Sequence, residues 1–110
     1  MEVITVTELK ALLDLAPGEI ALVDVRNPAD AEFASIKGSH FVPLASLESG
    51  EAIDRVRAFA EGRRLLMHCK LGGRSARAVE LLRPQGIAAT NVTGGIDAWS
   101  QQVDPGIPRY

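Results

Sequence analysis

The sequence predicts a small α/β domain with a mainly parallel sheet of four or five strands. Short β-branched runs alternate with segments of helical periodicity, and Pro or Gly residues separate them. The run from Ile20 to Val23 is continuously apolar, as in a strand that is covered on both faces. Because strands that alternate with helices need crossover connections, we expect parallel pairing and helices on both faces of the sheet.

The predicted elements follow one another at short intervals. In order they are a helix over 9–16, a strand over 19–26, a helix over 28–34, a strand over 40–45, a helix over 53–60, a strand over 64–69, a helix over 75–83, a strand over 88–93 and a helix over 96–103. Thr5 and Glu8 have the spacing of a capping box at the first helix, and Pro17 and Gly18 follow its end. Asn27 is expected to cap the second helix with its side chain.

The later strands and helices are predicted from the same kinds of sequence signal. Pro43 places the second strand at a sheet edge or a strand end. Ile53, Val56 and Ala60 form the apolar stripe of the third helix, and Gly62 ends it. The apolar run before Cys69 predicts a strand, and the last strand is closed by a Gly-Gly turn.

Composition indicates a single domain, residues 1–110, and excludes several functions. The chain is 46% hydrophobic and 24% charged, with a formal net charge of -2 and no basic run that would indicate nucleic-acid binding. No apolar stretch approaches the roughly 20 residues that a membrane span needs. One cysteine cannot form an internal disulfide, so we expect a cytoplasmic protein with a free thiol.

Cys69 lies where a predicted strand passes through "KLGGR" into a helix. Ligands of parallel sheets bind at this edge, and the helix directs its positive dipole end toward it. Gly72 and Gly73 can both adopt positive φ and turn successive N–H groups inward, while Lys70 and Arg74 add positive charge. We therefore expect a lowered Cys69 pKa and a reactive thiolate, rather than a cysteine that only packs in the core.

The other side chains do not identify one reaction. His68 precedes Cys69 on a strand and should point to the opposite face, and nothing in the spacing brings His40 to the site. A Cys–His hydrolase is therefore poorly supported, and no metal-ligand spacing is present. Chemistry that needs only a thiolate in an anion cradle remains: sulfur transfer through a persulfide, or phosphoryl transfer through a cysteinyl phosphate.

Four segments, in order along the chain, carry a resemblance to a known family. "HCKLGGRS" and "VTGGIDAW" look like an active-site loop and a closing Gly-Gly and Trp motif, and "LVDVRNPADAEF" looks like a strand-and-helix signature. With "IKGSHFVPLASL", they cover essentially the whole chain and resemble the rhodanese-like sulfurtransferases. One departure is Ser35, where many members have a histidine.

This resemblance implies a rhodanese-like fold, with a central five-stranded sheet, and Cys69 as the catalytic residue that carries sulfane sulfur as a persulfide. It also implies an amide cradle from the active-site loop, which consists of Lys70, Leu71, Gly72, Gly73 and Arg74. Related dual-specificity phosphatases have a loop one residue longer, so the length from Cys69 to Arg74 favours sulfur transfer. A cysteine phosphatase and a non-catalytic binding module of this fold remain alternatives.

A closer resemblance concerns the partners. "CKLGGRSA" and "VDPGIPRY" look like the rhodanese domain of adenylyltransferases that activate sulfur-carrier proteins for molybdopterin, thiamine or thio-amino-acid synthesis. It implies a small anionic sulfur donor such as thiosulfate, a sulfur-carrier protein or a cysteine desulfurase, and an adenylyltransferase on the same chain or a separate one. No metal or organic cofactor is implied.

Supporting roles are expected for several residues. Asp24 and Arg26 should form an ion pair that fixes nearby loops, and Arg74 should turn away from the site to pair with an acid such as Glu32. Lys70 should attract an anionic donor at the rim. Gly94 and Gly95 should let their backbone approach the Cys69 loop. The aromatic residues expected in the core are Phe33, Phe41, Phe59 and Trp99.

Overall fold

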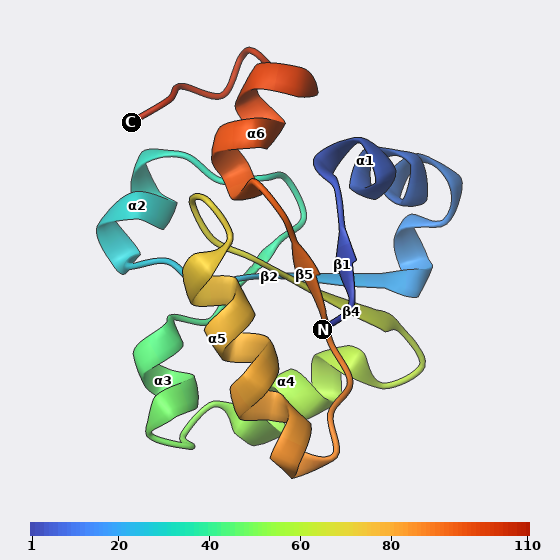
Figure 1. Ribbon diagram of the computed structural model, residues 1–110, viewed down its shortest axis with the longest axis vertical. Helices are drawn as coiled ribbons and strands as arrows, with labels where there is room; N and C mark the ends of the chain where they lie inside the picture. The colour runs from blue at the N-terminus through green and yellow to red at the C-terminus, as the bar shows by residue number, and fades with distance from the viewer.

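The computed structural model describes residues 1–110 and contains one five-stranded sheet in which all neighbouring strands are parallel. The strands are β1 (Val3–Ile4), β2 (Ile20–Asp24), β3 (His40–Phe41), β4 (Arg64–His68) and β5 (Thr90–Val92). Their order across the sheet is β1-β5-β4-β2-β3, so β4 lies in the centre (Figure 1). The predicted α/β class and five-stranded parallel sheet are confirmed.

Helices cover both faces of this sheet. They are α1 (Val6–Leu15), α2 (Pro28–Phe33), α3 (Leu44–Glu48), α4 (Ile53–Ala60), α5 (Gly73–Leu82) and α6 (Gly95–Gln102), with short 3₁₀ helices η1 (Pro17–Glu19) and η2 (Arg83–Gln85). α1 and α6 pack against one face, and α3, α4 and α5 pack against the other (Figure 1). None of these helices has the length and apolar character that a membrane crossing requires.

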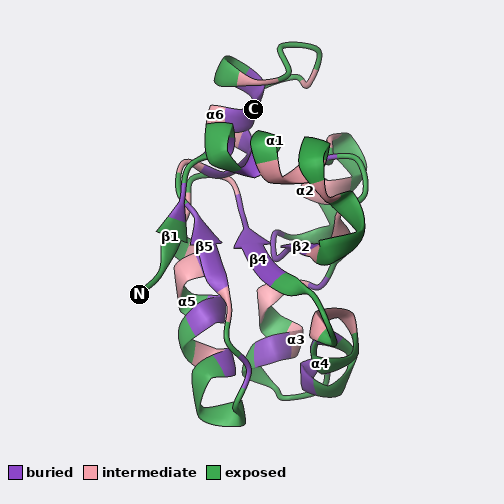
Figure 2. Ribbon diagram, turned by 90° about the vertical axis from the view of Figure 1, so that its right-hand side faces the viewer, coloured by how far each residue is buried: buried purple, intermediate pink, exposed green.

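The two-residue period of β4 divides the core into two halves. Leu65, Met67 and Cys69 belong to the half that packs under α3, α4 and α5. Leu66 faces the other way, into the half that contains Trp99 of α6. Burying one such large apolar side chain is worth about 1.5–3 kcal/mol. Figure 2 shows β2, β4 and β5 coloured as buried along most of their length. The alternation therefore fixes which face Cys69 occupies.

The helix starts agree with the sequence analysis in part. At α1 the Glu8 amide donates to Thr5 Oγ at 3.1 Å, and the Thr5 amide donates to Glu8 Oε1 at 2.9 Å, which confirms the capping box. The expected side-chain cap at α2 is wrong, because the Asn27 side chain makes no such bond. Pro28 occupies the first helical position, and the Asn27 carbonyl accepts from the amides of Asp30 and Ala31. α5 begins at Gly73, two residues earlier than predicted.

Two elements, β1 and α3, were not predicted from the sequence. β1 has only two residues, too few for periodicity to reveal a strand, and it forms by pairing with β5 at the sheet edge. α3 has five residues, of which Leu44 and Ala45 lie within the segment 40–45 that was predicted to be a strand. Pro43, in extended conformation with ψ 144°, caps this helix and separates it from the two-residue strand β3.

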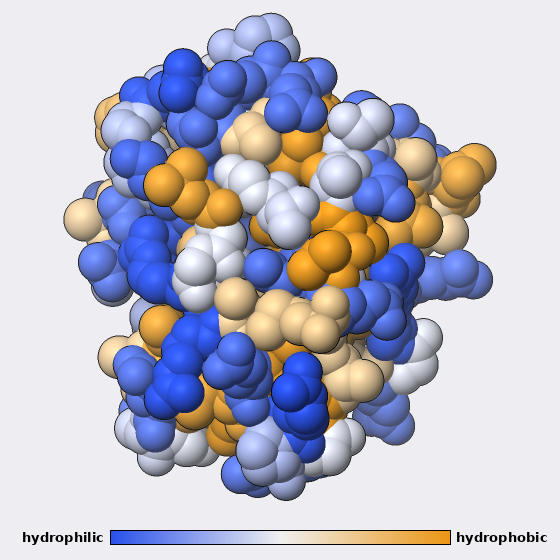
Figure 3. Space-filling model, in the orientation of Figure 1, coloured by the Kyte–Doolittle hydropathy of each residue, from blue (hydrophilic) through white to orange (hydrophobic).

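Two of the four aromatic predictions are wrong. Trp99 is buried and Phe59 packs against the core, but Phe33 is 57% exposed and Phe41 is 37% exposed. Phe33 ends the short helix α2, where it contacts the Tyr110 ring but stays exposed, and Phe41 lies on the edge strand β3. On the face in Figure 3, hydrophilic residues predominate, with smaller hydrophobic areas between them.

The start of α6 holds the loop that follows β4. The amides of Ile96 and Asp97 donate to the carbonyls of Cys69 at 2.9 Å and Lys70 at 3.1 Å, and the Gly94 amide donates to Leu71 O at 3.1 Å. This approach is so close that a Cβ at Gly95 would lie 2.3 Å from the Cys69 carbonyl oxygen. The expected approach of the Gly-Gly backbone to the Cys69 loop is confirmed.

We expect Gly95→Ala to lower the free energy of unfolding by about 2–5 kcal/mol, because φ is +55° there and the added carbon meets main-chain atoms. Urea unfolding measures the loss. Gly18→Ala is the matched control, since nothing lies within 4 Å of its added carbon and its φ is not positive. Equal losses in the two variants would contradict the close approach at Gly95.

Candidate active site

Cys69 is the first residue after the central strand β4, at the carboxyl edge of the sheet. The chain then turns through residues 70–72 and enters α5 at Gly73, as the yellow loop in Figure 1 shows. The Cys69 side chain is only 1% exposed. A pocket of about 270 Å³ nevertheless opens beside it, lined by Cys69, Lys70, Leu71, Gly73 and Arg74. Four of the five predicted loop residues therefore line the same pocket as the cysteine.

Hydrogen-bond donors face the Cys69 sulfur. The Gly72 amide donates to Sγ at 3.1 Å, and Ser75 Oγ lies 3.4 Å from Sγ. Burial by itself raises the pKa of the Cys69 thiol. The hydroxyl and amide of Ser75 and the amides of Gly72 and Leu71 outweigh burial, and the pKa lies below its ordinary value. The expected lowering of the pKa is confirmed, although Ser75 was not among the predicted donors.

Gly72, the loop member that does not line the pocket, forms the turn. Its φ is +121°, and a Cβ there would lie 3.6 Å from the Gly94 amide nitrogen. Gly73, by contrast, has no positive φ and is already the first residue of α5. The expectation of positive φ at both glycines is therefore wrong for Gly73, because one left-handed residue completes the turn and the helix starts at the next.

A buried polar network joins the loop to β5, and the sequence analysis missed it. Ser75 Oγ donates to Asn91 Oδ1 at 2.5 Å, and Asn91 Nδ2 donates to the Gly72 carbonyl at 3.2 Å. Asn91 pairs in register with Met67, so it shares the sheet face on which Cys69 lies. A polar residue inside the otherwise buried strand Thr90–Val92 was the available signal.

His68 is fully buried on the opposite face, as predicted. Its Nδ1 lies 3.2 Å from the Cys69 carbonyl, and Nε2 has no partner. Burial lowers the pKa of the imidazole, which disfavours its charged form. His40 stacks on Phe59 with ring centroids 4.1 Å apart and does not line the pocket. Neither histidine therefore presents a base to the sulfur.

Asp24 and Arg26 form the expected ion pair in the interior. Arg26 Nη2 lies 2.7 Å from Asp24 Oδ2, and Nε donates to Oδ1 at 2.9 Å. Burial raises the pKa of the Asp24 carboxyl, but the hydrogen bonds and charge of Arg26 outweigh it and hold the pKa below its usual range. Arg26 also donates to the Ala34 carbonyl and to the Tyr110 hydroxyl, at 2.6 and 2.9 Å. The pair fixes α2 and the C-terminal segment and does not itself touch Cys69.

Arg74 turns toward α2, as expected, but its partner differs from the predicted one. Arg74 Nη1 lies 3.7 Å from Asp30 Oδ2, whereas Glu32 is exposed and forms no ion pair. Asp30 lies in the first turn of α2, and Glu32 is two residues further along the same short helix. The prediction that Glu32 supports the loop is therefore wrong.

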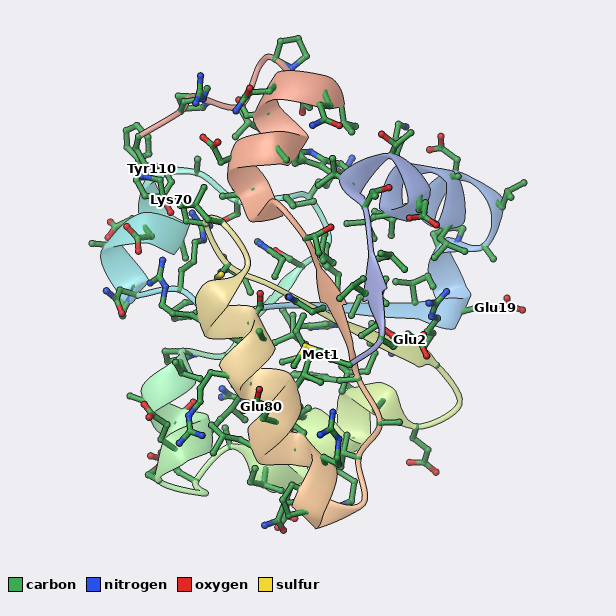
Figure 4. The ribbon with its side chains drawn as sticks, in the orientation of Figure 1. Met1, Glu2, Glu19, Lys70, Glu80 and Tyr110 are labelled. Carbon is green, nitrogen blue, oxygen red and sulfur yellow. The ribbon has the colours of Figure 1, made fainter.

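Tyr110 was also not predicted to lie near the site, but it packs on Lys70, which lines the pocket. Lys70 Nζ lies 4.5 Å from the centroid of the Tyr110 ring, and Figure 4 shows the two side chains together beside the loop. Phe33 packs edge-on against the same ring. Leu71 at the loop tip is 64% exposed. Lys70 thus remains at the rim, as expected, with an aromatic contact that sequence spacing could not reveal.

The fold and the pocket define an α/β domain with a buried, hydrogen-bonded cysteine at the end of its central strand. The family described as Rhodanese-like domain matches residues 5–102, and the chain belongs to this family. No group of three or more His, Cys, Asp or Glu side chains lies close enough together to hold a metal ion.

Three relatives show the breadth of the similarity. A 16.5 kDa protein in the psaL 5' region of Synechococcus elongatus is 40% identical over 96% of this chain and 73% of its own length. The maize adenylyltransferase and sulfurtransferase MOCS3-2 is 41% identical over 97% of this chain, which spans only 23% of that protein. The solved human single-domain sulfurtransferase TSTD1 superposes with a TM-score of 0.76, at 28% identity, over 93% of this chain and 97% of that one. Sulfurtransferases thus occur among the relatives, which supports that class of activity at the family level.

We expect Arg26→Ala to lower the free energy of unfolding by about 3–5 kcal/mol, because it leaves the buried Asp24 carboxylate without its partner. Chemical denaturation measures the change. Arg64→Ala is the matched control, since it breaks the exposed pair with Glu2 and we expect a much smaller loss. A loss no greater than that of the control would contradict a structural role for the buried pair.

Proposed function

We propose that this chain is a sulfurtransferase that carries sulfane sulfur as a persulfide on Cys69. The observation that carries the proposal is the position of Sγ, with the Gly72 amide 3.1 Å away and Ser75 Oγ 3.4 Å away beside an open pocket. These donors lower the pKa of the thiol despite its burial, and the thiolate is the nucleophilic form of cysteine. The relatives that are sulfurtransferases support the same chemistry.

In the first half-reaction, the Cys69 thiolate attacks the outer sulfur of thiosulfate. A bond forms between Sγ and that sulfur, and the sulfur–sulfur bond of thiosulfate breaks. Sulfite leaves with the electron pair, and Cys69 then carries an anionic terminal sulfur. The loop amides are suited to this charge because N–H groups at a turn and a helix start favour anions.

In the second half-reaction, an acceptor nucleophile takes the terminal sulfur. With cyanide as the acceptor, a carbon–sulfur bond forms, thiocyanate leaves, and the electron pair of the broken sulfur–sulfur bond returns to Sγ. The thiolate is restored without a change in charge. Neither half-reaction requires a metal or an organic cofactor, and the two-step mechanism predicts ping-pong kinetics.

The proposal extends to substrates and partners. Lys70 and Arg74 line the pocket as cations, which suits a small anionic sulfur donor. Because the chain matches part of an adenylyltransferase and sulfurtransferase, we propose a sulfur-carrier protein or a cysteine desulfurase as cellular partner, with an adenylyltransferase fused or separate. We place this activity in the cytoplasm, with residues 1–110 acting as one rhodanese-like unit.

Incubation with thiosulfate should add the mass of one sulfur atom to the intact protein, and reduction should remove it. We expect Cys69→Ser to gain no sulfur and to lose thiocyanate formation from thiosulfate and cyanide, because the nucleophile is absent. Intact mass spectrometry and the thiocyanate assay measure the two results, and circular dichroism checks that the variant is folded. Turnover by a folded Cys69→Ser at the parent rate would overturn the assignment. Cys69-dependent hydrolysis of an aryl phosphate, without sulfur gain, would favour the phosphatase alternative.

Lys70→Ala should lower kcat/KM for thiosulfate by about 3- to 10-fold at low ionic strength, because it removes a cation beside the entry of a dianion. In ping-pong kinetics this ratio reports the first half-reaction alone, so kcat/KM for cyanide should change less. Arg55→Ala on α4 is the matched control, since it removes one exposed positive charge that does not line the pocket. If the two variants lower kcat/KM equally, the effect comes from net charge and Lys70 has no local role.

A further inference from the structure

The hydroxyl of Ser75 has one proton and three neighbours that can accept it. Asn91 Oδ1 lies at 2.5 Å, the Gly72 carbonyl at 3.2 Å and Cys69 Sγ at 3.4 Å. These residues lie close together where α5 packs beside β5. Ser75 is fully buried, so bulk water does not donate to these acceptors in its place. A hydrogen bond from Ser75 to one acceptor is therefore made at the expense of the others.

The orientation of the Asn91 side chain favours its own oxygen as that acceptor. Asn91 Nδ2 donates to the Gly72 carbonyl at 3.2 Å, and a reversed amide would bring two carbonyl oxygens together there. The Gly72 contact thus directs Oδ1 toward Ser75, where the 2.5 Å separation is the shortest of the three. Asn91 competes with the sulfur for the Ser75 proton.

We propose that Asn91 is a positioning residue that draws the Ser75 hydroxyl proton away from Cys69 and so moderates ionisation of the thiol. This inference rests on the proposed function and adds to it a residue on β5. When Cys69 is a thiol, its S–H donates to Ser75 Oγ and the Ser75 hydroxyl donates to Asn91. When the thiol loses its proton to solvent, the Ser75 hydroxyl rotates to the sulfur and its bond to Asn91 is lost.

The same geometry determines which atom accepts the hydrogen bond from the Ser75 hydroxyl in each half-reaction. In the persulfide, the negative charge lies on the terminal sulfur and Sγ no longer carries it. The Ser75 hydroxyl then returns to Asn91, while the loop amides face the transferred sulfur. When the acceptor removes that sulfur and the electron pair returns to Sγ, the hydroxyl rotates back. Asn91 thereby stabilises the states in which Sγ is uncharged.

Charged groups around Cys69 stay the same in the variants that test this proposal. Lys70 and Arg74 line the pocket, and His68 precedes the cysteine on β4. The Asp24–Arg26 pair lies on the neighbouring strand β2 and its end, where Asp24 is in register with His68. Arg74 is the ionisable residue that α5 contributes to the pocket, and it pairs with Asp30 of α2. A change in the Cys69 pKa therefore reports the hydrogen-bond network.

Asn91→Ala is expected to lower the Cys69 pKa by about 0.5–1 unit, because the Ser75 hydroxyl becomes free to donate to the thiolate. The pH dependence of alkylation by iodoacetamide, with thiolate absorbance as a second readout, measures this shift. A merely structural role predicts the opposite sign, since loosening the loop would weaken the Gly72 donor and raise the pKa. An unchanged or raised pKa in a folded Asn91→Ala protein would overturn the proposal.

A double-mutant comparison makes the test specific. Ser75→Ala should raise the Cys69 pKa by about 1 unit, and Asn91→Ala added to Ser75→Ala should cause no further fall. If Asn91→Ala lowers the Cys69 pKa equally in the parent protein and in Ser75→Ala, Asn91 does not act through the Ser75 hydroxyl. Thr90→Val is the matched control, because it alters the adjacent buried polar residue of β5, which bonds to Glu2, and should leave the pKa unchanged.

These measurements are independent of sulfur transfer. Alkylation reports the Cys69 thiolate whether or not the protein accepts sulfur from thiosulfate. A protein that fails to gain sulfur, yet shows the lowered pKa in Asn91→Ala, would refute the proposed function and retain the role of Asn91. A protein that gains sulfur, yet shows no lowered Cys69 pKa in Asn91→Ala, would support the proposed function and refute the role of Asn91.

Discussion

The structure around Cys69 depends on one constraint: a sulfur that can ionise is held almost out of contact with water. Burial disfavours the charged form, so the thiolate forms only where donors replace the lost hydration. The turn after β4 supplies the Gly72 amide at 3.1 Å, and the first turn of α5 supplies the Ser75 hydroxyl at 3.4 Å. Cys69 also lines the pocket that opens beside the loop. The buried thiolate is stabilised here because main-chain amides and the Ser75 hydroxyl take the place of water.

Those donors remain aligned because the opposite side of the loop is also bonded. Its carbonyls at Cys69, Lys70 and Leu71 accept hydrogen bonds from the start of α6. The N–H groups on one side face the sulfur, and the C=O groups on the other side face a helix start. Gly95 permits the approach, since a side chain there would collide with the Cys69 carbonyl. The loop is thus held in place by a second turn about 25 residues further along the sequence.

Much of the fold and the location of the site could be predicted from local patterns. The capping box at Thr5, the apolar run of β2 and the Gly-rich turn after Cys69 are each contained within a few residues. The missed elements are those with too little local signal, such as the two-residue strand β1 and the short helix α3. The expected burial of Phe33 failed for a related reason, because an apolar residue on a short helix is buried only if another layer covers it.

The sequence by itself determined the α/β class, the strand-to-helix junction at which Cys69 lies, and the opposite orientation of Cys69 and His68 on the sheet. All three follow from the spacing of residues within short stretches of chain. Tertiary structure alone decided that Arg74 meets Asp30 rather than Glu32, that Tyr110 packs on Lys70, and that Asn91 reaches Ser75. Each of these contacts joins side chains from different elements. Their pairing depends on how the crossover connections bring the strands and helices together. No local pattern in the sequence encodes which side chains of different elements become neighbours.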